Sequence, residues 1–220
     1  MKTIESRIES QNWVMDTWVA VSWQDFLDLA DQPELQRGKF YYDQNLMRIE
    51  LLPIGPLHGH DNSVIARTIS LFATLNNIPI MEYLNTSFRH PQVRECQPDV
   101  AYYIGSELKL PPRNDSPVDV TEFDPPTLAV EIASTTLNDD LGRKRLLYER
   151  LGVQEYWVVD AKLGEVIVFA VADGGSKQIP ESQVLPGLGL KVVLEALERS
   201  QREDDGAVNR WLLEVFREVK

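Results

Sequence analysis

The strongest constraint on the fold is a strand–helix–strand pattern between residues 127 and 160. Thr127–Ala133 alternates, with Leu128, Val130 and Ile132 on one side and Ala129, Glu131 and Ala133 on the other. A helix is expected from about Asn138 to Leu151, closed by Gly152. Tyr156–Asp160 then reads as the next strand. Such a unit packs a helix against a sheet.

The remaining elements extend this arrangement. Ser22 is a plausible cap for a helix. Further strands and helices are expected at 39–42, 46–52, 58–75, 79–84, 99–104, 165–171 and 208–219, with a proline-rich irregular stretch at 105–126. Strands mixed with helices predict an α/β (α+β) fold, a mixed central sheet flanked by helices. We expect an N-terminal extension (1–18), one domain (19–195) and a C-terminal amphipathic helix (196–220) on the domain or a partner subunit.

The formal net charge of −12, from 34 acidic and 22 basic residues, opposes non-specific adhesion to nucleic acid. It does not oppose cleavage, because metal ions can carry the positive charge of a site. The single cysteine, Cys96, fits a core position and a reducing cytoplasm. We find no run of about 18 apolar residues and no secretory signal, so we expect a cytoplasmic protein without a membrane span.

Lys144 is the most informative single residue. On a helical wheel it falls near the middle of an apolar arc of roughly 120°, whereas Arg143 and Arg145 fall outside it. A lysine in a buried stripe is costly unless a carboxylate meets it. Glu131 is the natural partner: it lies about 10 Å back along the preceding strand, and Lys144 about 9 Å into the helix. If the helix folds back onto the sheet, the two side chains reach one level.

Asp99 begins the other strand, directly after Pro98. Two carboxylates on adjacent strands, Asp99 and Glu131, make a hard-oxygen site that Mg²⁺ or Mn²⁺ accepts. Such an ion polarises a phosphoryl oxygen and lowers the pKa of a water, and a buried lysine stabilises the developing charge. The alternative is a structural ion pair beside a strand-capping aspartate.

These residues resemble a known pattern. Gln97-Pro98-Asp99, Glu131-Ile-Ala-Ser134, Asp140, Lys144 and Tyr148 resemble the PD-(D/E)XK nuclease superfamily, and within it the Uma-two family of "putative restriction endonucleases". Further matches are Pro53-Ile-Gly-Pro-Leu-His58, Gly152-Val-Gln-Glu-Tyr-Trp157 with Asp160, and Leu185-Pro-Gly187. The resemblance runs from about residue 20 to 195 and implies a restriction-endonuclease-like fold with Asp99, Glu131 and Lys144 as catalytic residues. The lysine usually two positions after the acid is Ala133 here, so the resemblance implies that it has moved to Lys144.

Four further residues are accessory candidates. The resemblance implies a role near the metal for His58, with a helix-cap or surface histidine as the alternative and His60 as its competitor. Glu50 is a third carboxylate or part of a solvated strand face. Tyr148 contacts substrate or the lysine, or is a core tyrosine. Asp140 pairs with Lys144 or favours the helix N-terminus. Candidate phosphate contacts, or ordinary solvated charges, are Arg89, Arg94, Lys109 and Arg113.

The resulting hypothesis is a Mg²⁺- or Mn²⁺-dependent endonuclease that cleaves DNA by direct water attack. A non-catalytic interaction domain that keeps the fold and the ion pair is the second hypothesis. The third is a phosphodiesterase that acts on a small nucleotide. It is retained because the acidic net charge opposes adhesion to long nucleic acid. The two-fold symmetry of duplex DNA favours a homodimer.

Overall fold

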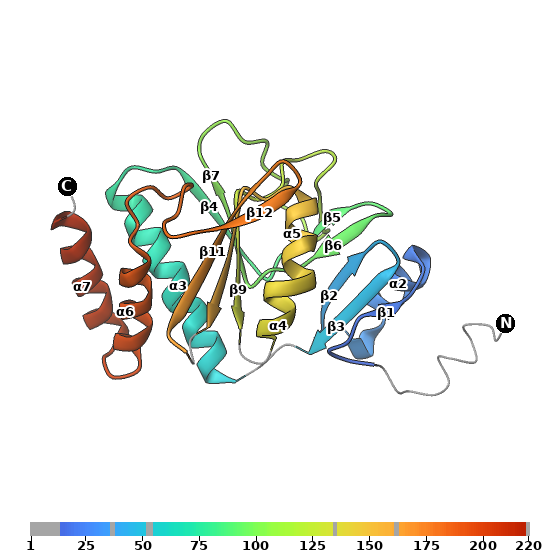
Figure 1. The fold of residues 1–220 in the computed structure, drawn as a ribbon, viewed down its shortest axis with the longest axis horizontal. Coiled ribbons are helices and arrows are strands. Elements are labelled where there is room, and N and C mark those ends of the chain that lie inside the picture. Colours follow the sequence, from blue (N-terminus) through green and yellow to red (C-terminus); the bar gives the residue numbers. More distant parts are fainter. Residues whose placement is uncertain (1–13, 36–37, 52–54, 134–135, 161–162, 219–220) are drawn as a thin grey trace.

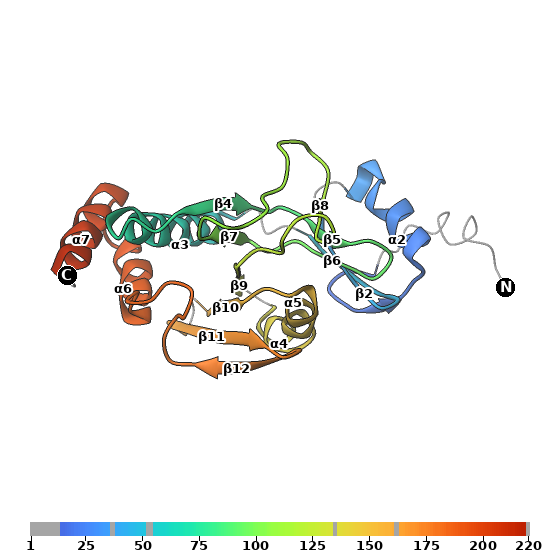
Figure 2. The same cartoon turned by 90° about the horizontal axis from the view of Figure 1, so that it is seen from above.

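The computed structural model describes residues 14–35, 38–51, 55–133, 136–160 and 163–218, and within them the strands form two mixed sheets (Figures 1 and 2). The strands of the first sheet, in spatial order, are β1 (Val19–Ala20), β3 (Leu46–Leu51), β2 (Gly38–Asp43), β6 (Arg94–Cys96), β5 (Phe88–His90) and β8 (Val118–Asp119). Those of the second are β12 (Gly175–Ile179), β11 (Glu165–Ala172), β10 (Glu155–Asp160), β9 (Leu128–Ala133), β7 (Val100–Ile104) and β4 (Ile80–Leu84). The mixed architecture with flanking helices confirms the predicted fold class.

The helical segments flank these sheets. They are α2 (Trp23–Ala30), the 3₁₀ turn η1 (Pro33–Leu35), α3 (Pro56–Leu75), α4 (Leu137–Asp139), the π segment η2 (Asp140–Lys144), α5 (Arg145–Leu151), α6 (Leu190–Ser200) and α7 (Asp205–Glu218). Ser22 caps α2 as expected, because its hydroxyl accepts a hydrogen bond from the backbone N–H of Asp25 at 3.2 Å. Within the described part of the chain, no helix is both long and apolar enough to cross a bilayer.

Strand β9 lies inside the second sheet, antiparallel to β7 and parallel to β10. The side chains of β9 point alternately to its two faces and pack into two separate hydrophobic clusters. Leu128, Val130 and Ile132 pack with residues of α3, α6 and α7, whereas Ala129 and Ala133 pack with residues of α5 and β2. Both faces are therefore buried, and Glu131 is carried on the face that looks toward α5 and β2.

The β2–β3 hairpin turns at Gln44 and Asn45, whose φ angles of 50° and 68° are those of a tight two-residue turn. One face packs on α2 through Phe40, Tyr42, Met47 and Ile49. The opposite face carries Lys39, Tyr41, Arg48 and Glu50, since Lys39 pairs with Glu50 and Tyr41 with Arg48 in the register. The hairpin therefore turns a row of charged groups toward the rest of the protein.

The expected continuous helix from Asn138 to Leu151 is wrong in one respect. The segment is α4, then π-helical η2, then α5, with Gly142 at φ −105° and ψ −106° inside η2. A wheel with a constant 100° per residue cannot represent such an interruption. Lys144 nevertheless points inward and is 1% exposed.

The C-terminal part contains two elements that the sequence analysis missed, α6 and β12. Strand β12 has little apolar alternation to reveal it, but α6 buries Val193, Ala196 and Leu197 at helical spacing. Helices α6 and α7 both contact α3, and the Phe72 and Phe216 rings lie 5.3 Å apart. The 195/196 boundary falls within α6. Leu52 and Val219, included above in a strand and a helix, lie outside the described residues.

Candidate active site

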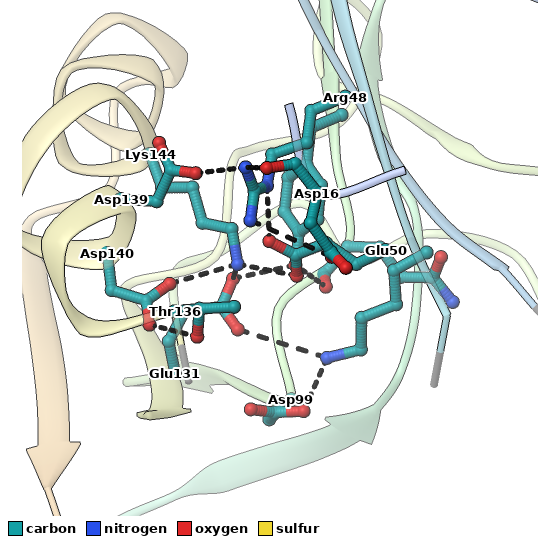
Figure 3. Close-up of polar contacts among 12 residues, drawn as sticks. Asp16, Arg48, Glu50, Asp99, Glu131, Thr136, Asp139, Asp140 and Lys144 are labelled. Carbon is teal, nitrogen blue, oxygen red and sulfur yellow. Dashed lines mark hydrogen bonds and ion pairs between the residues drawn. The ribbon is translucent and has the colours of Figure 1, made fainter. Parts of the chain in front are cut away.

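The structure brings the candidate residues into one buried cluster between the β2–β3 hairpin, β9 and the η2–α5 segment. Figure 3 shows the acids Glu50, Asp99, Glu131 and Asp140 around the side chain of Lys144. Lys39 supplies a second cation, which is ion-paired with Asp99. Each of these four carboxylate residues is at most 6% exposed. The cluster therefore concentrates charge in a place that excludes most water.

Asp99 directly precedes β7, and the register of β7 with β9 sets it beside Glu131, as the adjacent-strand expectation required. Asp99 Oδ2 accepts a hydrogen bond from the backbone N–H of Ile132 at 2.8 Å, and Oδ1 lies 3.1 Å from His58 Nε2 and is ion-paired with Lys39. Although burial raises the pKa of the Asp99 carboxyl, the Lys39 charge and the His58 hydrogen bond outweigh it. Its pKa is therefore well below the ordinary value, and Asp99 is ionised.

Glu131 is held by donors from both sides. Its Oε1 accepts hydrogen bonds from the hydroxyls of Tyr148 at 2.7 Å and Tyr41 at 3.1 Å. Lys144 lies 3.9 Å from Oε1, and Lys39 lies 3.9 Å from Oε2. Burial raises the pKa of Glu131 to about 8, and the charges of Lys144 and Lys39 oppose this rise. Tyr148 is thus both a core tyrosine and a direct partner of the acid.

Lys144 meets carboxylates, as its position in a buried stripe required. Its nearest partners are Glu50 Oε2 at 2.8 Å and Asp140 Oδ1 at 2.9 Å, and its ammonium lies 4.3 Å from the centre of the Tyr41 ring. Glu131, expected as the main partner, is the most distant of the three acids. Burial lowers the pKa of Lys144. The negative charges of Glu131, Asp140 and Glu50 raise it by more than burial lowers it, so its net pKa is above the ordinary value. The amine is charged.

Glu50 does not lie on a solvated strand face, so that interpretation is wrong. Its Oε1 accepts a hydrogen bond from Arg48 Nε at 2.6 Å, and Arg48 is also ion-paired with Asp139 (Figure 3). Asp139 in turn accepts a hydrogen bond from Trp18 Nε1 at 2.9 Å. Strand β3 of the hairpin is thus joined to α4 by the Arg48–Asp139 ion pair and to η2 by the Glu50–Lys144 ion pair.

The sequence analysis missed Lys39, Tyr41 and Arg48 as members of this cluster. A signal was present, because residues 39 and 41 alternate on one strand and 48 and 50 on its hairpin partner. In a tight hairpin such residues share one face. The sequence pattern gave no reason, however, to treat a strand face with charged residues as buried.

The two histidines at the start of α3, His58 and His60, have different partners. His58, in the first turn of α3, points toward Asp99, and its Nδ1 has no hydrogen-bond partner among the residues described. His60 Nε2 points away to Asp205 Oδ1 on α7 at 3.0 Å. His58 is therefore the histidine near the acids.

Several of the basic residues considered for phosphate contacts are engaged within the protein. Arg89 is ion-paired with Glu95, and Arg94 lies 3.4 Å from Asp43 and donates to the carbonyl of Arg150. The ammonium of Lys109 lies 5.2 Å from the centre of the Phe123 ring. These contacts reduce the charge that they can offer to a phosphate.

The chemistry of the donor set fits a hard divalent cation at Asp99 and Glu131. Both carboxylates reach the single cationic atom Nζ of Lys39, so their oxygens already converge on one cation position. Over the described ranges, no cluster of three or more His, Cys, Asp or Glu side chains is arranged as a complete metal site. One or two carboxylates are, however, what a protein commonly offers to Mg²⁺, with water and phosphate as the other ligands.

A cavity of about 480 Å³ opens beside the cluster and is lined by Asp16, Arg48, Thr136, Asn138 and Asp139. Two of its lining residues contact the cluster: the Thr136 hydroxyl donates to Asp140 Oδ2 at 2.6 Å, and Arg48 donates to Glu50. The cavity is the size of a small-ligand pocket.

Comparison with known proteins identifies relatives of the chain. A family model described as "Uma2: Putative restriction endonuclease" matches residues 23–202. A crystal structure described as a putative nuclease belonging to DUF820, from Anabaena variabilis ATCC 29413, is similar with a TM-score of 0.55 and 17% sequence identity; the alignment covers 80% of this chain and 99% of that one. No curated protein matches. The structural likeness bears on the fold, and the family match covers most of the chain.

Proposed function

Because this chain belongs to the Uma2 family, described as putative restriction endonucleases, we propose that it is a divalent-metal-dependent endonuclease that hydrolyses DNA phosphodiester bonds. The observation that carries the proposal is the meeting of Asp99 and Glu131 on one cation position, with the charged Lys144 in the same buried cluster. Two acids and a lysine in this relation suffice for hydrolysis of a phosphodiester by water. The nuclease-like fold of the solved relative is consistent with it.

In this proposal Asp99 and Glu131 would hold Mg²⁺ or Mn²⁺, which would supply Lewis-acid polarisation of the phosphate and lower the pKa of a water. Lys144 keeps its positive charge and stabilises the negative charge that develops on the phosphate. Glu50 and Asp140 hold that ammonium in place, and Tyr148 fixes the orientation of Glu131. His58 orients Asp99 through its hydrogen bond.

A second candidate is a phosphodiesterase that acts on a small nucleotide. Two observations favour it: the net charge of −12, which opposes the binding of a long duplex, and the cavity of about 480 Å³ beside the cluster. A long duplex needs many phosphate contacts, whereas a small nucleotide needs few. The same residues would perform the hydrolysis.

A cleavage assay tests the proposal. The wild-type protein with Mg²⁺ or Mn²⁺ is expected to cleave plasmid DNA, and with EDTA it is not. Glu131→Gln and Lys144→Ala should each lose at least about 10²-fold in rate, as expected when a group acting on transition-state charge is removed. Lys177→Ala, an exposed change on β12, is the matched control and should keep full activity.

Substrate comparison separates the two candidates. Cleavage of plasmid or duplex oligonucleotide supports the endonuclease, whereas turnover of cyclic or dinucleotide substrates alone supports the second candidate. Metal-independent activity contradicts both candidates. The absence of activity on every substrate also contradicts both and favours a non-catalytic interaction domain. For the endonuclease we further propose a cytoplasmic location and a homodimer that matches the two-fold symmetry of DNA. Light scattering would test the homodimer.

A further inference from the structure

Lys39 provides the second cation of the cluster. It lies on β2, its Nζ is ion-paired with Asp99 Oδ1, and it is 3.9 Å from Glu131 Oε2. Its side chain is 4% exposed, so water does not solvate the ammonium in place of these acids. Lys39 therefore occupies the space between the two acids that are proposed above as the metal ligands, and it neutralises the charge of Asp99.

We propose that Lys39 is a resident counter-ion that a divalent cation must displace, so that this lysine sets the metal affinity of the site. The inference rests on the proposed function, because it assumes that Asp99 and Glu131 are the metal ligands. It adds Lys39 to the functional residues of the site, as the one that opposes the entry of the metal.

A divalent ion and the Lys39 ammonium need the same oxygen. Lys39 occupies Asp99 Oδ1, whose partner oxygen Oδ2 already accepts from the Ile132 backbone. A divalent ion and an ammonium that share Oδ1 would repel each other strongly at such distances in a buried site. Lysine has a flexible four-carbon stem, which lets its head group leave without moving β2.

Lys144 differs from Lys39 in this respect. Its closest acids are Glu50 and Asp140, which hold it at 2.8 and 2.9 Å, and neither is a proposed metal ligand. Lys144 therefore keeps its partners when a metal arrives, whereas Lys39 loses its own. The two lysines are an internal comparison within one site.

The first test measures Mn²⁺ binding by calorimetry and by electron paramagnetic resonance. Lys39→Met removes the charged amine and keeps an unbranched four-atom stem, and it should bind Mn²⁺ at least about tenfold more tightly than wild type. The matched control Lys177→Met makes the same change in net charge on the exposed β12 and should bind like wild type. The double variant Lys39→Met/Glu131→Gln should lose the gain. Unchanged or weaker binding by Lys39→Met overturns the inference.

The second test uses the wild-type protein and does not depend on how well a variant folds. Reductive methylation followed by peptide mass spectrometry measures the accessibility of each lysine. Lys39 should be protected in EDTA and methylated severalfold faster with saturating Mg²⁺, while Lys144 stays protected in both. Equal protection of Lys39 with and without bound Mg²⁺ overturns the inference.

The results also separate this inference from the proposed function. If wild type cleaves DNA with metal but Lys39→Met binds Mn²⁺ no more tightly, only the counter-ion role fails. If neither wild type nor Lys39→Met binds Mn²⁺, both the metal-dependent function and the inference fail.

Discussion

Tyr41 and Tyr148 donate hydrogen bonds to the same oxygen, Oε1 of Glu131, from opposite sides of the cluster. Tyr41 comes from the β2–β3 hairpin and Tyr148 from α5. With this oxygen occupied, Oε2 is the atom that faces Lys39. The two tyrosines thus leave Oε2 as the Glu131 oxygen that a cation at the position of Lys39 Nζ can approach.

Removal of one tyrosine hydroxyl should therefore loosen Glu131 without emptying the core. Tyr148→Phe keeps the ring against Tyr156, where the centroids are 4.7 Å apart. We expect a loss of about 0.5–1.5 kcal/mol in the free energy of unfolding, the usual value of one hydrogen bond. We also expect a lower rate of DNA cleavage, measured at saturating metal. An unchanged cleavage rate would contradict the positioning role of Tyr148.

The stability of the metal-free protein should depend on pH through Glu131. Its folded pKa of about 8 lies above its ordinary value of 4.5, so the folded protein binds this proton more tightly than the unfolded chain. That contribution is fully present below pH 4.5 and is lost as pH rises through 8. Between pH 5 and 8 the free energy of unfolding should fall by up to about 1.4 kcal/mol per pH unit. Urea titrations in EDTA should show a flatter profile for Glu131→Gln; an equally steep profile would refute the assignment.

Lys144 should be essential for stability as well as for chemistry. Lys144→Met leaves Glu50 and Asp140 buried without their common cation, and the loss should be about 3–5 kcal/mol. Glu50 keeps its ion pair with Arg48, so Asp140 is the acid left without a cation. The double variant Lys144→Met/Asp140→Asn removes that charge and should recover part of the loss. Chemical denaturation of the variants measures both values. Equal stability of the single and double variants would show that Asp140 does not depend on the charge of Lys144.

Divalent metal should stabilise the folded protein in proportion to its binding. At a free Mg²⁺ concentration 100 times the dissociation constant, the gain should be about 2.7 kcal/mol. Asp99→Asn removes one proposed ligand and should abolish most of this gain in thermal unfolding. A gain of the same size in Asp99→Asn would place the metal elsewhere.

The opposite side of the sheet should matter for stability alone. Phe216 on α7 is 3% exposed and packs on Phe72. Phe216→Ala should cost about 3–5 kcal/mol in the free energy of unfolding. Because α3 and the sheet separate this contact from the acids, the cleavage rate of the folded variant should stay at the wild-type value. A large rate loss in fully folded Phe216→Ala would link this helix to the site.

The sequence by itself determined features that are written in local periodicity. The alternation around Glu131 places a carboxylate on one face of β9, and the apolar stripe around Lys144 places an amine inside, even though a π segment interrupts the helix. Chain neighbours impose these patterns through strand and helix geometry, so no distant contact is needed to detect them.

The tertiary structure alone decided the partners. Lys144 meets Glu50 from 94 residues away, and Lys39 meets Asp99 across 60 residues. Whether the charged face of the hairpin is solvated or buried depends on what packs against it, and no local pattern contains that information. A buried cation takes whichever acids the fold brings within reach, because an unpaired charge in a dry interior is too costly to leave.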